Sequence, residues 1–428
     1  NQYKNARSIR MEQNYRSTGN ILDAANAVIS NNTERKGKEL WTNNERGDLL
    51  TLYTAASETD EAQYVASRIL EGYSRGENWR DFAVLYRMNA QSNQLEYAFK
   101  RNGIPYRVIG GTRFFDRAEI KDILAYLCVI NNPSDDLRLL RIVNVPARAI
   151  GNRTIEELTR VAGLENISAF ETMKKASQLP DLQKSAARLA VFVELIEDLR
   201  SIVSNTPLDE FYDILLSKTG YLSMLEAKDT IENTAKIENI KELKTNIIAF
   251  LKERENGTLS EFLDEIALYT DLEQLDPEGD SVVMMTMHSA KGLEFPTVFI
   301  VGAEEGIFPG AGAMLEPAEM EEERRLCYVA MTRAKERLYI TNAHHRMLFG
   351  KTSTNRLSRF VDEIPDSYIE KPRAKALYET SRFVKAVQPI PEYRPAKLDY
   401  SPPAKPMSTE SLAYKKGDTV EHKAFGRG

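Results

Sequence analysis

The sequence predicts an α/β fold in which a parallel sheet is split by a large all-helical insertion and followed by a Pro-rich tail. Three observations predict this fold. Strand and helix patterns alternate over roughly the first hundred residues. Helical patterns then run almost without strands over residues 112–280, and strand patterns return at Ser281. Strands that alternate with helices are typical of a parallel sheet covered by helices.

The first part of the sheet is predicted from three short strands with a helix after each of the first two. Phe82–Tyr86 (FAVLY) is a continuous apolar run, as expected for a strand buried on both faces. The other two strands are predicted at residues 49–53 and 106–109. Helical periodicity covers residues 59–71 and 91–101.

The insertion and the second part of the sheet follow in order. The helical patterns of the insertion lie at residues 120–130, 208–216, 237–251 and 259–268. The later strands are predicted at residues 282–287, 298–301 and 338–341, with a long helix at 319–336. The simplest account is one α/β domain, formed by residues 1–111 and 281–364, that is interrupted by a helical domain of residues 112–280.

The C-terminal part of the chain differs in composition. Eight of the 17 prolines lie in residues 365–406, so residues 365–416 are predicted to be a Pro-rich linker. Residues 417–428 (GDTVEHKAFGRG) resemble the opening strand and turn of a small β module that is truncated. The chain also starts without Met, and we expect it to be part of a longer protein.

Composition indicates an ordinary globular protein, with 42% hydrophobic and 28% charged residues. No apolar run approaches the ~18 residues that span a bilayer, so no membrane partner is expected. Cys128 and Cys327 both lie in apolar helical patterns, which indicates reduced core thiols in a cytoplasmic protein. Two Cys and four His cannot supply a zinc-ribbon spacing, and no metal site is predicted.

Net charge decides little about partners. The chain carries −6, but from Lys371 onward 12 Lys and Arg face 6 Asp and Glu. The rest of the chain is therefore more acidic than the average suggests. Local sites must decide whether the partner is a nucleic acid.

Arg333 is the first candidate site residue. It ends the segment EEERRLCYVAMTR (321–333), which is predicted to be helical, and falls in line with the apolar Leu326 and Val329. A buried guanidinium is costly without an anionic partner. That partner could be a carboxylate of the same domain, which helix geometry alone favours, or a phosphate bound at a domain cleft. Arg324 and Arg325 are interpreted as surface or structural ion pairs.

A second candidate is the polar turn in MTMHSAKGLEF (285–295). Ligands of α/β sheets bind at the carboxyl ends of strands, and we place His288, Lys291 and Glu294 there. Two alternatives stay open. His288 could be a turn residue bonded to the backbone, and Glu294 could be a helix-start or ion-pair carboxylate.

Two further segments carry arginines beside predicted helix starts. In QNYRSTGN (13–20), a helix N-terminus next to Arg16 is a ready anion site, and Tyr15 could stack on a base. In LYRMNAQS (85–92), Arg87 and Asn89 directly follow the buried strand and could contact phosphate or bases. The alternative for the second segment is capping of the helix after Asn89.

Taken together and in order, these segments resemble the later motifs of superfamily 1 DNA helicases of the PcrA/UvrD/Rep type. The matching stretches are QNYRST, LYRMNAQS, GGTRFFDRAEIKD, TMHSAKGLEF and EEERRLCYVAMTRAKE. The resemblance covers essentially the whole chain, and the ending is most similar to that of Gram-positive bacterial members. It implies a second RecA-like motor domain (residues 1–111 and 281–364) split by a mobile, 2B-like accessory domain (residues 112–280).

The resemblance implies a nucleotide site. Tyr15 is expected to pack against adenine, and Glu294 to hold the ribose. Arg16 and Arg333 are expected to reach the γ-phosphate, which reverses the preference for a carboxylate at Arg333. Arginines of this kind stabilise charge on the transferring phosphoryl group, so these two residues are the catalytic candidates.

The resemblance also implies contacts with single-stranded DNA. The residues expected there are Arg87, Asn89, Thr286, His288 and Phe349. Phe349 is the stacking candidate among them.

A third implied site lies in the helical insertion. VPARAIGNRT (145–154) resembles the hairpin turn that this family uses on duplex phosphates, with Gly151 just before a helix start. Ala149 stands where the family usually has the first glycine of the turn. A further departure is the GAGA run (310–313), where the family often has a polar, DNA-contacting segment with His.

The sequence lacks a complete phosphate-loop motif. A phosphate loop needs G-x-x-x-x-G-K-[ST], and Gly350-Lys351-Thr352 supplies only its end, since His345 stands at the first position. No Asp-Glu pair follows a strand where it could hold Mg²⁺. We therefore expect ATP and Mg²⁺ to need an N-terminal motor domain outside this chain. The chain alone is expected to bind no cofactor and to hydrolyse no ATP.

The complete enzyme is expected to be an ATP-dependent 3′–5′ DNA helicase of repair and replication, acting on single strands and on ss/ds junctions. RNA polymerase and repair proteins are the partners implied for the C-terminal tail. Two other classes were weighed. A non-catalytic DNA- or partner-binding relative would have no use for Arg16 and Arg333 together. A helicase–nuclease subunit would need a cluster of Asp, Glu and Lys that the tail does not offer.

Overall fold

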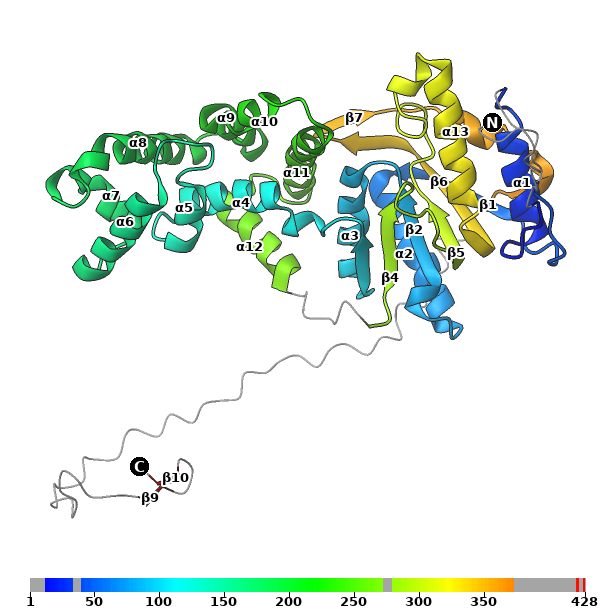
Figure 1. Cartoon of the computed structure of the whole chain (residues 1–428), viewed down its shortest axis with the longest axis horizontal. Coiled ribbons are helices and arrows are strands. Elements are labelled where there is room, and N and C mark those ends of the chain that lie inside the picture. The colour runs from blue at the N-terminus through cyan, green and yellow to red at the C-terminus, as the bar shows by residue number, and fades with distance from the viewer. Residues whose placement is uncertain (1–11, 34–39, 272–278, 373–420, 423–425, 428) are drawn as a thin grey trace, which may run out of the picture. The chain divides into compact units, whose positions relative to one another are not determined.

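The computed structural model describes residues 12–33, 40–271, 279–372, 421–422 and 426–427. Its centre is an eight-stranded sheet in the order β3-β4-β2-β5-β6-β1-β8, with β7 joined to β6 (Figure 1). All neighbours along this order are parallel, whereas β7 forms an antiparallel hairpin with β6. The strands are β1 (Leu50–Ser57), β2 (Phe82–Tyr86), β3 (Tyr106–Ile109), β4 (Val282–Thr286), β5 (Phe295–Ile300), β6 (Ala334–Leu348), β7 (Lys351–Ser353) and β8 (Ile369–Glu370). The predicted α/β fold with a parallel sheet is confirmed.

Helices cover both faces of this sheet (Figure 1). On one face pack α1 (Gly19–Ile29), α13 (Pro317–Met331) and α14 (Arg359–Asp362), and on the other α2 (Glu58–Ser74) and α3 (Ser92–Arg101). A hydrophobic core lies on each face of the sheet, and alternate residues of β2 pack into each. Leu85 packs towards α1 and α13, whereas Val84 packs towards α2 and α3. Every residue of β2 is buried, which explains its unbroken apolar sequence.

A helical segment, α4 to α12, lies between β3 and β4. Its helices are α4 (Ala118–Asn131), α5 (Asp136–Ile142), α6 (Asn152–Glu165), α7 (Ala169–Lys174), α8 (Ala186–Val203), α9 (Leu208–Thr219), α10 (Tyr221–Glu226), α11 (Ile231–Glu253) and α12 (Leu259–Asp271). The segment has its own core, which includes Tyr126, Phe192 and Phe211. β3 and β4 pair directly, Tyr106 opposite Val282, so the chain leaves the sheet and returns to the neighbouring position.

Short 3-10 helices connect several of these elements. They are η1 (Trp79–Asp81), η2 (Asn89–Gln91), η3 (Phe114–Asp116), η4 (Ala176–Gln178), η5 (Gln183–Ser185), η6 (Gly312–Met314) and η7 (Asp366–Tyr368). In the described part of the chain, no helix is both long and apolar enough to cross a bilayer.

The helix predicted at residues 319–336 is wrong at its end. α13 stops at Met331, and β6 begins at Ala334. The reason is tertiary, because Ala334 pairs with Phe295 of β5 and its carbonyl accepts a hydrogen bond from the Ser17 hydroxyl (2.8 Å). The strand predicted at residues 338–341 is correspondingly longer, 15 residues in all.

Two strands of the sheet were not predicted. β7 follows the Gly350 turn, so the Gly350-Lys351-Thr352 stretch lies in a hairpin rather than before a helix. β8 falls within the range predicted as a Pro-rich linker, and it pairs with β1 at Leu50 and Thr51. A two-residue strand carries too little sequence pattern to be recognised.

The chain divides into two compact units, Asn1–Pro372 and Arg373–Gly428. In the second unit, β9 (Glu421–His422) pairs antiparallel with β10 (Gly426–Arg427). The remainder of the predicted small β module, and the predicted linker from residue 373 onward, lie outside the described residues.

Candidate functional site: two edges of one sheet

The predicted site residues fall on opposite edges of the sheet. Glu294 immediately precedes β5 and Arg333 immediately precedes β6, so both lie at the amino edge. Arg87 follows β2, and Thr286 ends β4, opposite Tyr86, so both lie at the carboxyl edge. Placing Glu294 at the carboxyl edge beside His288 was therefore wrong. Parallel strands all run the same way, so the connection from β4 must cross the length of the sheet before β5 begins.

Arg333 is held at the amino edge by neutral oxygens. Its Nε donates to the Val329 carbonyl (2.9 Å), and its two terminal nitrogens donate to the Leu293 carbonyl (3.0 Å) and the Thr332 hydroxyl (3.2 Å). Among the described residues, no carboxylate forms an ion pair with it. Burial and the nearby Arg16 lower the pKa of the Arg333 guanidinium. The carboxylate partner that helix geometry favoured is thus absent from the described residues, and Arg333 does not even lie on the helix.

Arg16 and Glu294 form an ion pair next to Arg333. Arg16 donates from Nε to Glu294 and also to the Thr332 carbonyl (3.3 Å). Lys335 lies 2.8 Å from the other oxygen of Glu294. Hydrogen bonds from Lys335 and Arg16 lower the pKa of Glu294 to about 2. Two cations, Arg16 and Lys335, therefore share one carboxylate, and the Arg333 guanidinium beside them has none among the residues described.

The loop before α1 sets the position of Arg16 and Tyr15. The Asn14 side chain accepts hydrogen bonds from the backbone N–H of Arg16 (2.7 Å) and Ser17 (2.9 Å), which closes a tight turn. Tyr15 projects from this turn with 77% of its surface exposed, and its hydroxyl donates to Gln13 (2.7 Å). A ring that is so exposed and held at its edge leaves its face available for stacking.

At the carboxyl edge, Arg87 is already paired. Its guanidinium donates in a bidentate manner to the Glu323 carboxylate of α13, from Nε to Oε2 at 3.1 Å and from a terminal nitrogen to Oε1 at 2.8 Å. His288 is exposed nearby, and its burial on one side together with Arg87 lowers its pKa. His288 is therefore mostly uncharged at neutral pH and can donate or accept a hydrogen bond.

Thr286 and Asn89 lie on the same edge in different settings. The Thr286 hydroxyl hydrogen bonds to that of Ser289 (2.9 Å), which shapes the turn after β4. The Asn89 side chain is exposed, and its backbone carbonyl accepts from Arg117 (3.4 Å). The alternative for this segment was capping of the helix after Asn89. The Gln91 side chain accepts hydrogen bonds from the backbone N–H groups of Arg87 and Met88 at the start of η2, so this contact is made by Gln91 and not by Asn89.

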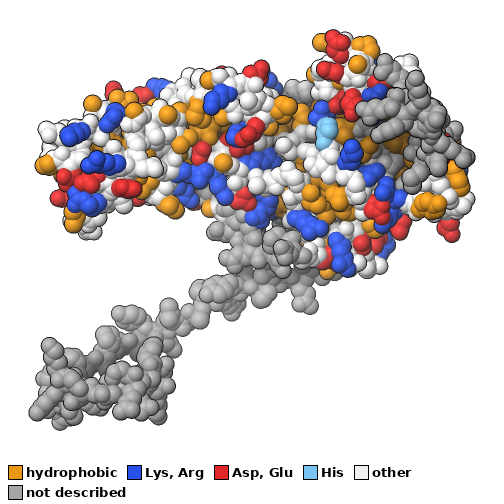
Figure 2. Space-filling view, viewed as in Figure 1, with side chains coloured by type: hydrophobic (Ala, Val, Ile, Leu, Met, Phe, Trp, Pro, Cys, Tyr) orange, Lys and Arg blue, Asp and Glu red, His pale blue; other side chains and the backbone are white. Residues whose placement is uncertain are grey.

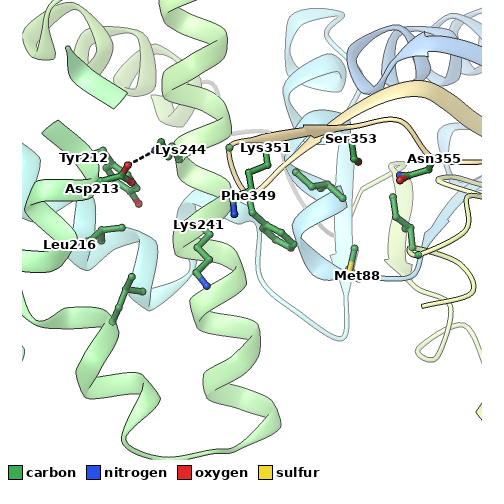
Figure 3. Close-up of a pocket in the computed structure, with 15 residues that line it drawn as sticks. Met88, Tyr212, Asp213, Leu216, Lys241, Lys244, Phe349, Lys351, Ser353 and Asn355 are labelled. Atoms are coloured by element: carbon green, nitrogen blue, oxygen red, sulfur yellow. Dashed lines mark hydrogen bonds and ion pairs between the residues drawn. The ribbon is translucent and has the colours of Figure 1, made fainter. Parts of the chain in front are cut away.

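Phe349 lies at the tip of the β6–β7 hairpin, on the wall of a cleft of about 720 Å³. The cleft is lined on one side by α9 and α11 and on the other by the hairpin and Met88. Figure 3 shows the Phe349 ring pointing from the hairpin into the space between Lys241 and Met88. The structure thus brings Phe349 beside the segment that carries Arg87 and Asn89.

Gly151 lies in the helical segment, as the residue before α6. The turn that precedes it is built around Arg148, which donates to carbonyls of Ile142, Pro146 and Thr219 and to the Tyr126 hydroxyl. Ala149 has a φ of 55°, a left-handed conformation that favours glycine. The turn therefore keeps the backbone shape of a glycine turn without the glycine.

Sequence reasoning missed several residues of these sites. Glu323 stands in a run of three glutamates, and the sequence does not show which one faces Arg87. Lys335 was predicted to be part of a helix. It lies two residues after Arg333, and side chains two residues apart in an extended chain point to the same side. Asn14 carried the turn signal of an Asx residue and could have been found.

The face of the molecule in Figure 2 shows no concentration of charge of one sign in the part of the chain that is described there. Figure 2 shows Lys and Arg side chains spread over both the helical segment and the sheet elements, interspersed with Asp and Glu. Among the described residues, no group of three or more His, Cys, Asp or Glu could hold a metal ion. The two guanidinium groups and the open tyrosine ring of the amino edge suit a nucleotide phosphate and base, while the described residues offer no cluster for Mg²⁺.

Comparison with known proteins identifies the family of this chain. Residues 9–345 match the family model described as the UvrD-like helicase C-terminal domain. The chain is 42% identical over 433 residues to the ATP-dependent DNA helicase PcrA of Bacillus subtilis (strain 168). It is also 42% identical to the proteins of that name from Staphylococcus epidermidis (strain ATCC 12228 / FDA PCI 1200), over 434 residues, and Staphylococcus aureus (strain NCTC 8325 / PS 47), over 437.

Each alignment covers 100% of this chain and 58% of the relative, so the chain spans little more than half the length of these relatives. A solved structure described as the C-terminal domain of a possible DNA helicase from Lactobacillus matches with a TM-score of 0.33 at 12% identity, over 84% of this chain and 99% of that one. So low a score carries no argument about the fold. The family model covers most of the chain, and the chain belongs to the UvrD-like helicase family, of which it carries the C-terminal domain.

Proposed function

We propose that this chain is the C-terminal part of an ATP-dependent 3′–5′ DNA helicase, and that it forms one wall of the ATP site and part of the single-strand track. In this proposal, residues 1–111 and 281–364 are the second RecA-like motor domain and residues 112–280 its accessory domain. The protein is expected to be cytoplasmic. The observation that carries the proposal is Arg333, a half-buried cation that is oriented by neutral oxygens and is without a carboxylate among the described residues.

The amino edge fits the phosphate end of a nucleotide. Two neighbouring guanidinium groups repel each other, and this repulsion contributes to the lowered pKa of Arg333. A polyphosphate anion between them would remove the repulsion, and guanidinium groups bind phosphate oxygens in a bidentate manner. Arg16 now pairs with Glu294, so phosphate binding by Arg16 would release this carboxylate to accept a hydrogen bond from a ribose hydroxyl.

The chemical contribution of the edge is electrostatic. As the γ-phosphoryl group transfers to water, negative charge spreads over its oxygens, and Arg16 and Arg333 stabilise that charge. Arginines in this role contribute about 10³-fold or more to the rate. Tyr15 stacks on the adenine. The phosphate loop and the ligands of Mg²⁺ are supplied by the other motor domain, with which this edge must pack.

The carboxyl edge fits single-stranded DNA. Arg87 and His288 offer donors to phosphates, Thr286 and Asn89 offer short polar groups, and Phe349 offers a ring on which a base can stack. Arg87 is neutralised by Glu323, so a DNA phosphate competes with a carboxylate for it. Gly151 contacts the duplex at an ss/ds junction through backbone N–H groups at the start of α6. RNA polymerase or repair proteins would bind through the C-terminal tail.

The decisive test uses the protein in which this chain is joined to its phosphate-loop domain. We expect DNA-stimulated ATP hydrolysis, and unwinding of a duplex with a 3′ tail but not a 5′ tail. Arg333→Ala is expected to lower kcat by about 10³-fold and Arg333→Lys to recover little, because Lys lacks the planar fork.

Arg325→Ala is the matched control, since Arg325 lies on the adjacent α13 and, within the described part of the chain, forms ion pairs with Glu321 and Glu322 of its own helix. It should hydrolyse ATP at the wild-type rate. Wild-type kcat in Arg333→Ala would contradict the assignment of the ATP wall, and unwinding from the 5′ tail would contradict the direction.

A further inference from the structure

Helix α11 carries a line of polar residues, the buried Asn239, Glu242 and Thr245 and the half-buried Asn246, which we call the α11 polar stripe. Residues three or four apart share a face of a helix. Glu242 and Thr245 are 0% exposed and Asn239 is 5% exposed. A buried helix face is normally apolar, so a stripe of this kind needs polar partners.

Two of those partners are Asn93 in α3 of the sheet domain and Arg117, the residue before α4. Asn246 exchanges hydrogen bonds with Asn93 of α3 (2.6 and 3.2 Å). Asn239 accepts from Arg117 (2.7 Å), which also donates to the carbonyl of Asn89 (3.4 Å). The α11 polar stripe thus reaches the segment that follows β2.

The most distinctive contact is with the turn of the β6–β7 hairpin. The backbone N–H of Phe349 donates to the Glu242 carboxyl group (2.9 Å), and the N–H of Gly350 donates to the Thr245 hydroxyl (3.0 Å). Both turn residues are left-handed, with φ of 56° and 71°, as in a two-residue hairpin turn. The two successive backbone N–H groups of the turn therefore both donate to side chains of α11.

The fit around Gly350 is tight. A Cβ at this position would lie 3.0 Å from Cδ of Lys244, whose ammonium group is paired with Asp213. The aliphatic part of the Lys244 side chain therefore packs against Gly350. The turn thus packs closely against α11, and its two hydrogen bonds set the position of the Phe349 backbone.

Glu242 acts on the turn as a hydrogen-bond acceptor. It forms no ion pair among the described residues, and its other donors are Asn93 (3.4 Å) and Thr245 (3.2 Å). Burial raises the pKa of Glu242 to about 8, with Glu58 adding to the rise. At neutral pH the group is mostly uncharged, so an amide should serve in its place.

We propose that Glu242 and Thr245 are positioning residues for single-strand binding, which hold the Phe349–Gly350 turn on α11 and so set where the Phe349 ring stands in the cleft. This rests on the proposed function, in which Phe349 stacks on a DNA base. It adds that the helical segment shares directly in the single-strand track, through a helix that precedes the hairpin by about a hundred residues.

The test is a double-mutant cycle in the protein that joins this chain to its phosphate-loop domain. The measurement is the Kd for labelled oligothymidine, by fluorescence anisotropy. Phe349→Ala is expected to weaken binding about 5- to 150-fold, the range that corresponds to the loss of one stacked base. Glu242→Ala and the isosteric Thr245→Val are expected to weaken it about threefold to tenfold.

The double variants show whether Glu242 and Thr245 act through the Phe349 ring. In the Phe349→Ala background, neither Glu242→Ala nor Thr245→Val should weaken binding further, because both act through the ring that is gone. Glu242→Gln should bind like the wild type, and so should the control Glu253→Gln on the exposed end of α11. Additive losses in the cycle would overturn the proposal, since a general loss of structure adds to any other loss.

A spectroscopic readout separates the proposal from the function on which it rests. Phe349→Trp, labelled with 5-fluorotryptophan, gives a ¹⁹F resonance that is identified by its absence from the parent protein. Glu242→Ala and Thr245→Val should shift or broaden it without DNA, whereas Glu242→Gln should not. An unchanged resonance in both variants would overturn the positioning role. Wild-type DNA affinity in Phe349→Ala would instead overturn the DNA role of Phe349.

Discussion

The ionisation of individual charged side chains in this protein depends on surroundings that differ from site to site. At Arg333, three neutral oxygens orient a guanidinium without neutralising it. Glu294 is exposed, and hydrogen bonds from two cations hold its pKa at about 2, whereas burial raises that of Glu242 to about 8. A group near the surface with cations beside it favours its charged form, and a buried group without one favours its neutral form.

Glu242 should leave a signature in the pH dependence of stability. Its folded pKa lies above the usual 4.5, so the unfolded chain ionises first as the pH rises. Between about pH 4.5 and 8 its contribution to the free energy of unfolding should therefore fall, by up to about 1.4 kcal/mol per pH unit. We expect Glu242→Gln to lose this slope, so that its stability relative to the wild type rises across that window.

Urea unfolding of both proteins at pH 5, 6, 7 and 8 measures the difference. Parallel stability curves would show that Glu242 does not titrate in this window. Glu253→Gln, an exposed change on the same helix, should run parallel to the wild type.

Glu323 is expected to restrain DNA binding. It neutralises Arg87, so Glu323→Gln should free one cation while the amide oxygen still accepts from the Gly310 N–H. Single-strand affinity at low salt should rise, and the slope of log K against log salt should steepen by about 0.7, the value for one further phosphate contact. Titrations at several salt concentrations test this, with Glu322→Gln as the exposed control. An unchanged slope would mean that Arg87 does not meet a phosphate.

Among the elements, β6 connects the two edges of the sheet. Arg333 precedes its first residue, and Phe349 follows its last. Near its far end, Arg346 is buried between Glu61 and Glu304, 2.6 Å from each carboxylate. Removing one partner from such a buried ion cluster typically costs about 3–5 kcal/mol, so Glu61→Gln or Glu304→Gln is expected to lower the free energy of unfolding by about this amount.

The turn between α5 and α6 offers a test at the same scale. The left-handed conformation of Ala149 costs about 1–2 kcal/mol relative to glycine, and the extra freedom of an unfolded glycine offsets about 0.4–1 of this. Ala149→Gly should therefore raise the free energy of unfolding by roughly 0.5–1 kcal/mol.

Ala147→Gly is the matched control, two residues away, exposed and without a positive φ. It should lower stability by about 0.4–1 kcal/mol. Thermal or urea unfolding of the two variants gives the comparison. If both changes destabilise the protein alike, Ala149 is not strained.

In the whole molecule, one sheet keeps two sites apart. Its amino edge gathers Arg16, Glu294 and Arg333, and its carboxyl edge carries Arg87, Thr286 and His288. The helical segment joins the carboxyl edge through α11, at the Phe349 hairpin. The body of the sheet therefore separates the two proposed sites, and the helical segment contacts the edge that is proposed to bind DNA.

This division predicts the behaviour of the chain by itself. With only one wall of the proposed ATP site, it should bind ATP weakly and hydrolyse none. Adding a separately prepared phosphate-loop domain should restore DNA-stimulated hydrolysis, and adding it to the Arg333→Ala chain should not. Calorimetry and a phosphate-release assay measure the two steps. Hydrolysis by the chain alone, free of contaminating ATPase, would contradict the division.

The sequence by itself determined the α/β class, the strand β2, in which every residue is buried, and the motif residues that led to the family. These are local or periodic signals, such as the apolar run of β2 and the short segments around Arg16 and Arg333. The tertiary structure alone decided that Glu294 and His288 lie on opposite edges, that β6 begins at Ala334, and that α11 holds the Phe349 turn. Each of these depends on strand pairing or on hydrogen bonds between residues far apart in the chain, and no local pattern records such contacts.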